Sequence, residues 1–144
     1  MAKEFPDISE QETVIIENEL DWTVTGEDID WESGDILTLP KGVMLKILNQ
    51  NEEEGRLDGF QKFPEGYIEP RHTHEAAHAA IILDGQMHLH GHVLTSGDYL
   101  YGQKKPHGPM EYTNPDGDGD YGCIVFISYI GGSPAHQWDE DPNE

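Results

Sequence analysis

Apolar and polar residues alternate over short stretches of this chain, and clusters of turn-forming residues separate the stretches. The alternation predicts strands at residues 43–49 and 56–63, because side chains two apart share one face of a strand. The polar link NQNEEEG between them predicts an antiparallel hairpin. Pro64 to Gly66 then predicts a turn.

The second half of the chain also alternates short predicted strands with turns. The pattern predicts a strand at 79–83, a turn at Asp84–Gly85, an alternating strand at 86–90, a turn at 96–98 and an apolar strand at 124–130. A 3.6-residue periodicity is hard to find in the sequence. These features indicate an all-β domain of the sandwich or barrel type.

Composition and charge narrow the classes of function. The 144 residues suit one domain, and no apolar run approaches the ~20 residues of a membrane helix. The N-terminus lacks a secretory signal pattern, so we expect a cytoplasmic protein. A net charge of -21 repels phosphate backbones and anionic lipids, which argues against nucleic acid and membranes as partners. The one cysteine, Cys123, lies in an apolar segment, and we expect it to be a buried free thiol.

Histidines provide the candidate chemistry. Seven of the eight lie between positions 72 and 107, a concentration that core packing does not require. His72 and His74 are two residues apart, so on a strand both would offer nitrogen atoms to one ion. His88, His90 and His92 have the same spacing. A second metal site is conceivable there, although a solvated face or a pocket wall is the commoner outcome.

The surroundings of the first pair follow a known framework. Gly66 precedes His72 by six positions, His78 follows His74 after three residues, and Gly85 follows His78 after six. This segment resembles the first cupin motif, with His78 in the place of the usual glutamate. The segment from Gly97-Asp98 to Pro106-His107 resembles the second motif, although it is one residue short and lacks the internal Pro-x-Gly.

The resemblance implies a single-domain cupin β-barrel or jelly roll over residues 40–132. Residues 1–39 would form an N-terminal arm with the first strands, and residues 133–144 an acidic tail. Within the superfamily the chain looks closest to acetylacetone dioxygenases, the sensor domain of ChrR anti-sigma factors and resistomycin-type polyketide cyclases. The resemblance also implies a homodimer, and one divalent metal ion held by His72, His74 and His107, with His78 as the fourth ligand.

The function expected from this resemblance is metal-dependent catalysis on a small, enolisable, β-diketone-like compound. Four neutral imidazoles leave the charge of the ion uncompensated, which favours a substrate that is anionic when bound. Fe(II) would suit a non-haem dioxygenase and Zn(II) a redox-neutral polyketide cyclase, and imidazole ligands alone do not select between them. A non-catalytic cupin that senses a metal or a ligand is the third alternative.

Further candidates lie near the presumed ligands in the sequence. Glu75 and Glu111 could each act as a general base, although in so acidic a chain a solvent-facing glutamate is the commoner role. Tyr101, with Tyr67 and Tyr112, could line the pocket and donate a hydrogen bond to a substrate oxygen, or could serve packing alone.

Overall fold

The computed structural model of the protein describes residues 20–22, 24–25, 42–51, 53–103, 105–132 and 136–138. Most of the expected arm at 1–39 and of the expected tail at 133–144 therefore lies outside the described residues. No helix in the described ranges is long and apolar enough to span a membrane.

The described residues form strands joined by turns and loops, without a helix. The strands are β1 (Val24–Thr25), β2 (Met44–Asn51), β3 (Arg56–Phe63), β4 (Tyr67–Glu69), β5 (His72–His74), β6 (Ala77–Leu89), β7 (His92–Leu94), β8 (Tyr99–Gly102), β9 (Met110–Thr113), β10 (Cys123–Ile130) and β11 (His136–Trp138).

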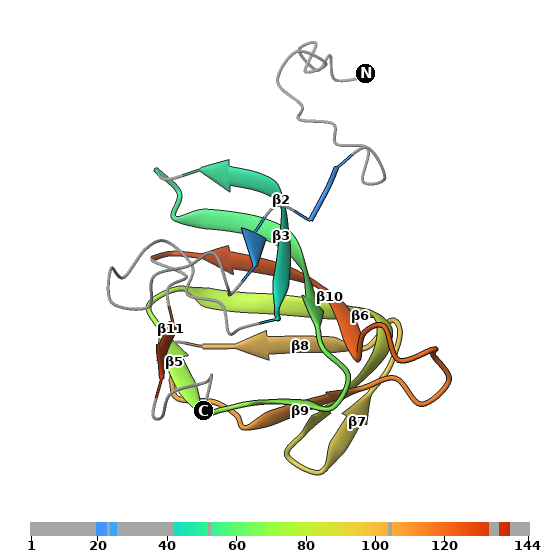
Figure 1. Ribbon diagram of the computed structural model, residues 1–144. Coiled ribbons are helices and arrows are strands. Elements are labelled where there is room, and N and C mark those ends of the chain that lie inside the picture. The colour runs from blue at the N-terminus through green and yellow to red at the C-terminus, as the bar shows by residue number, and fades with distance from the viewer. Residues whose placement is uncertain are drawn as a thin grey trace, which may run out of the picture.

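One curled sheet contains most of these strands. Its order is β1-β2-β3-β10-β6-β9-β4, with β7 and β8 also paired to β6, while β5 and β11 form a separate two-stranded ladder. In Figure 1, β3, β10, β6 and β8 lie side by side across the molecule, and β9 and β7 curl beneath them. The predicted all-β class is confirmed.

The predicted hairpin is present as β2 and β3, which pair antiparallel. Inward and outward side chains alternate along β3 and again along β10, as the sequence pattern requires. Phe63 on β3 and Val125 on β10 point inward, and both are almost fully buried. The two strands thereby form one wall of the core.

The turn predicted at Asp84–Gly85 is wrong, because β6 runs without interruption from Ala77 to Leu89. Gly85 has a φ of 76°, and the register between β6 and β10 shifts opposite Ile124 and Val125. The glycine therefore bends the strand instead of reversing it. Before the bend β6 pairs with β8 and β10, and beyond it with β7 and β9, so the bend curls the sheet.

The core lies inside this curl. Its buried apolar residues are Val43, Leu45, Leu57, Phe63, Ala76, Ala80, Ile82, Met87, Leu89, Met110, Tyr112, Cys123, Val125, Ile127 and Tyr129. The rings of Phe63 and Tyr112 are nearly parallel, with centroids 3.7 Å apart, and they join β3 to β9. The expected burial of Cys123 as a free thiol is confirmed.

Candidate metal centre

A backbone bridge brings the two histidine-containing segments together. The amide of His72 donates to the carbonyl of His107 at 3.0 Å, and the amide of His107 donates to the carbonyl of His72 at 2.9 Å. Strand alternation turns His72 and His74 to the same buried side of β5, with Thr73 between them on the other side. Residues 35 positions apart in the sequence thus enter one cavity.

Backbone carbonyls fix the orientation of two of these rings. Nδ1 of His72 lies 2.9 Å from the carbonyl oxygen of Pro70, and Nδ1 of His74 lies 2.5 Å from that of Ala76. Each Nδ1 therefore carries the proton and donates it, which leaves the lone pair on Nε2. One ligand nitrogen from each of His72, His74 and His107 lies within 4.8 Å of the other two. These three histidines form the cluster that could hold a metal ion.

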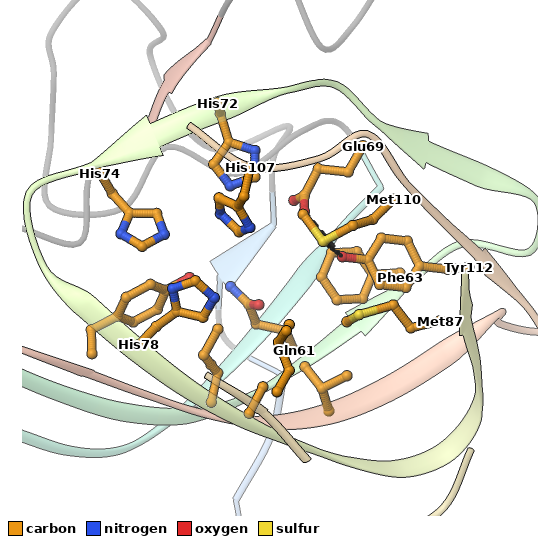
Figure 2. Close-up of a pocket in the computed structure, with 15 residues that line it drawn as sticks. Gln61, Phe63, Glu69, His72, His74, His78, Met87, His107, Met110 and Tyr112 are labelled. Atoms are coloured by element: carbon orange, nitrogen blue, oxygen red, sulfur yellow. Dashed lines mark hydrogen bonds between the residues drawn. The ribbon is translucent and has the colours of Figure 1, made fainter. Parts of the chain in front are cut away.

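His78 stands beside this three-histidine cluster. Its ring centroid is 4.7 Å from that of His74 and 4.8 Å from that of His107, and the side chain is 2% exposed. Figure 2 shows the four imidazoles around one space, with His78 facing His72 and His107 from the opposite wall. His78 is not one of the residues whose ligand nitrogens lie within 4.8 Å of one another. Its role as a fourth ligand stays a prediction.

Burial and neighbouring histidines favour the neutral form of three of these imidazoles. Burial, and then the neighbouring histidines, lower the pKa of His78 to about 3 and that of His107 to about 2. Burial also lowers the pKa of His74. Neutral imidazole is the form that binds a transition metal. Nδ1 of His78 and Nε2 of His107 are buried and have no hydrogen-bond partner in the described part of the chain. The residues present therefore fit a metal ion.

A buried carboxyl group shares the cavity, and the sequence analysis missed it. Glu69 on β4 is 6% exposed, and its Oε1 accepts a hydrogen bond from the Tyr112 hydroxyl at 3.0 Å. Burial raises the pKa of Glu69 to about 7, although the bond from Tyr112 lowers it. The one feature of the sequence that could have pointed to Glu69 is its position between Gly66 and His72. In a chain with 29 acidic residues, that position does not distinguish it from the others.

The cavity enclosed by these groups is small. Its volume is about 20 Å³, enough for about one water-sized group. The lining residues are Gln61, Phe63, Glu69, His72, His74, His78, Ala80, Met87, Leu100, His107, Met110, Tyr112, Val125, Ile127 and Tyr129. A larger open groove of about 390 Å³ lies at the β6–β7 hairpin and shares Met110 with the cavity.

The other expected catalytic residues lie outside this cavity. Glu75, Glu111 and Tyr101 are exposed, and none of them lines it. Glu111 and Tyr101 are on strands β9 and β8, and alternation turns them away from the buried side that Tyr112 and Leu100 face. Of the three tyrosines considered, Tyr112 lines the cavity.

The second histidine row is not a metal cluster. His90 and His92 are exposed, β6 ends at Leu89, and His90 has a φ of 51° in the turn before β7. Because the chain reverses there, the three rings do not share one strand face. Nε2 of His88 lies 2.8 Å from Oγ1 of Thr113. Within the described ranges the one metal-competent cluster is His72, His74 and His107.

Comparison with solved structures shows the fold. An RmlC-like cupin from Ralstonia eutropha JMP134 has 21% identity and a TM-score of 0.54, over 71% of this chain and 62% of that one. A candidate acetylacetone dioxygenase from Methylibium petroleiphilum PM1 has 15% identity and a TM-score of 0.61, over 100% of this chain and 89% of that one. KdgF from Halomonas sp. has 18% identity and a TM-score of 0.54, over 83% of this chain and 94% of that one. The fold is therefore that of a cupin.

Coverage and sequence matches complete the comparison. The chain spans less than two thirds of two Ralstonia eutropha cupins, 62% and 56% of their lengths. No curated protein sequence matches it significantly. The sequence profile of the ChrR cupin-like domain matches residues 19–127, which is more than half of the chain. The chain therefore belongs to the ChrR cupin-like domain family.

Proposed function

We propose that this protein is a divalent-metal-dependent enzyme that acts on a small enolisable carbonyl compound, and that it is a non-haem dioxygenase for a β-diketone-like substrate. The observation that carries this proposal is the set of imidazoles gathered in one cavity with a buried carboxyl group. The fold shared with the candidate acetylacetone dioxygenase of Methylibium petroleiphilum is consistent with it.

The residues that would hold the ion are His72, His74 and His107, with His78 as a proposed fourth ligand. The carbonyls of Pro70 and Ala76 would keep two of the rings in place, since a ligand histidine commonly donates its other N–H to such a group. Imidazole suits both Fe(II) and Zn(II), and we propose Fe(II) for the dioxygenase.

The chemistry follows from this environment. A divalent ion held there would supply Lewis acidity, which lowers the cost of removing a proton beside a carbonyl group. The ligand set brings no negative charge, so the site would favour a substrate that binds as an anion. Phe63, Val125 and Ile127 line the remaining wall and would exclude water from the reacting groups.

The test combines metal analysis with oxygen uptake. The protein would be stripped with a chelator, reconstituted separately with Fe(II) and Zn(II), and assayed for metal content and for uptake with acetylacetone. We expect stoichiometric metal in both forms and uptake with iron alone. His74→Ala should lose the metal and the uptake, whereas the exposed His92→Ala should keep both. A protein that binds neither ion would contradict the proposal.

A non-catalytic cupin that senses a metal or a small ligand is the second candidate. The match to the ChrR cupin-like profile and the cavity of about 20 Å³ favour it. Stoichiometric metal without turnover of any diketone would move the assignment to this function. A redox-neutral polyketide cyclase is the third candidate. A polyketide is larger than a diketone, so the cavity of about 20 Å³ would have to open further for it.

A further inference from the structure

Glu69 is an unusual residue to find at its position. The carboxyl group lies in the same cavity as the four imidazoles, and among the described lining residues there is no lysine or arginine to pair with it. Figure 2 shows Glu69 entering the cavity beside His72 and His107, with its carboxyl group turned toward Tyr112 and Met110. A carboxylate without a cationic partner is costly to bury, so packing alone does not explain this glutamate.

The hydrogen bond from Tyr112 holds the carboxyl group of Glu69 firmly. The donor, the Tyr112 hydroxyl, is 1% exposed, and its ring is stacked on Phe63. The bond fixes Oε1, so the carboxyl group has a defined direction inside the cavity. Tyr67 and Tyr129 also lie close enough for the charge of Glu69 to raise their pKa values. The titratable groups around Glu69 are therefore phenols and imidazoles.

We propose that Glu69 is the proton acceptor for the substrate, an inference that rests on the proposed function. The C–H bond beside the substrate carbonyl breaks, its electron pair passes into the enolate, and the proton goes to the Glu69 carboxylate, forming an O–H bond. No further reactant is needed, because the same proton can return to the product. Tyr112 is a positioning residue that acts through Glu69.

Glu69 is better placed for this role than the two glutamates singled out by the sequence. Glu75 and Glu111 are exposed and do not line the cavity, so water would compete for any proton they handle. Among the described lining residues, Glu69 is the glutamate that shares the cavity with the cluster. Its pKa of about 7 supports the assignment, since a general base works best near the operating pH.

The experiment counts protons when the diketone binds. Acetylacetone would be titrated anaerobically into the Zn(II)-reconstituted protein in a calorimeter, about one pH unit above the pKa of Glu69. The heat of binding in two buffers of different ionisation enthalpy gives the number of protons released to the buffer. In the wild type Glu69 takes the proton, so we expect almost none to reach the buffer. In Glu69→Gln we expect about one proton per diketone bound. The matched control Glu111→Gln, the same change on an exposed glutamate, should behave as the wild type.

The outcomes separate the two proposals. Equal proton release from the wild type and Glu69→Gln, with binding retained, would overturn the role of Glu69 and leave the proposed function standing. Absence of diketone binding in the wild type would overturn both. If Glu69→Gln does not fold, Tyr112→Phe gives the answer, because losing the phenol bond raises the pKa of Glu69. The midpoint of proton release against pH should then move upward, and an unchanged midpoint would overturn the proposal.

Discussion

At the scale of single residues, Gly102 controls the position of His78. A Cβ at this position on β8 would overlap Cε1 of the His78 ring and lie 2.7 Å from its Nε2. The absence of a side chain at 102 therefore leaves the space that the His78 imidazole occupies beside β8. This contact links a glycine in the middle of the second motif segment, between Gly97 and His107, to the geometry of the metal centre.

We predict that Gly102→Ala displaces His78 and lowers the free energy of unfolding by about 1–3 kcal/mol, the range for an overpacked core. Urea denaturation of the metal-free protein would measure the loss, and Zn(II) titration would show whether the affinity falls with it. In the His78→Ala background the same change should cost little, since the ring is gone. If Gly102→Ala lowers the free energy of unfolding equally with and without the His78 ring, the new methyl group does not clash with that ring.

At the scale of elements, the bend in β6 decides how the sheet curls. Gly85 has a positive φ, and a Cβ there would overlap the carbonyl oxygen of Gly122, the residue before β10. Glycine has no Cβ, so it allows both this φ and the close approach of the two backbones at the bend. The bend separates the part of β6 that carries His78 from the part that pairs with β9.

We predict that Gly85→Ala lowers the free energy of unfolding by about 3 kcal/mol or more, because backbone strain and a backbone clash add. Gly91→Ala is the matched control: its φ is 80°, but nothing lies within 4 Å of the added Cβ. That variant should lose only the strain, about 1 kcal/mol. Thermal and urea denaturation would compare the two, and equal losses would contradict the role of the close backbone approach.

At the scale of the whole molecule, the buried imidazoles make the metal-free protein sensitive to acid. The unfolded chain takes up protons near the ordinary histidine pKa of about 6.5, whereas folded His78 and His107 stay neutral down to about 3 and about 2. Their stabilising contribution is therefore present at neutral pH and lost as the pH falls below 6.5. Glu69 has the opposite effect on stability. In the folded protein it keeps its proton up to about pH 7, whereas in the unfolded chain it loses the proton near pH 4.5. Its contribution to the free energy of unfolding is therefore lost as the pH rises from about 4.5 to 7.

We predict that the free energy of unfolding in the presence of a chelator falls between about pH 6.5 and 5, because at least two histidines outweigh one glutamate. Urea denaturation across this range would give the slope. Glu69→Gln should steepen it, since the opposing contribution is removed, whereas the exposed His92→Gln should leave it unchanged. A flat profile in the wild type would contradict the neutral, buried imidazoles.

The outer face of the sheet bears on assembly, and the homodimer expected by resemblance stays a prediction. Ile81 and Tyr99 are directly paired across β6 and β8 and are 39% and 61% exposed. Phe126 continues the same row on β10. Sedimentation should show a dimer for the wild type and a monomer for Tyr99→Asp. Ile68→Asp, at an equally exposed position on β4, should stay dimeric, and a monomeric wild type would contradict the prediction.

Sequence patterns predicted the parts of this fold that depend on local chemistry. The strands around 43–49, 56–63 and 124–130 were predictable because alternation follows directly from the pleat. The turn at Asp84–Gly85 was wrong because a glycine with positive φ can bend a strand as well as end it. The burial of Glu69 depends on Tyr112, 43 positions away, and no local pattern carries that information.

The enclosure of the cavity has a consequence for how metal content is interpreted. His72 and His74 are 1% and 5% exposed and His107 is partly buried, so little of the ligand shell meets solvent and an ion held there would exchange slowly. We therefore expect the chain to trap whichever suitable ion is present as it folds and to release it slowly. The metal found after purification would then depend on which ions the growth medium supplied. The selectivity of the site itself is measured by refolding the chain in metal-buffered mixtures where iron and zinc compete.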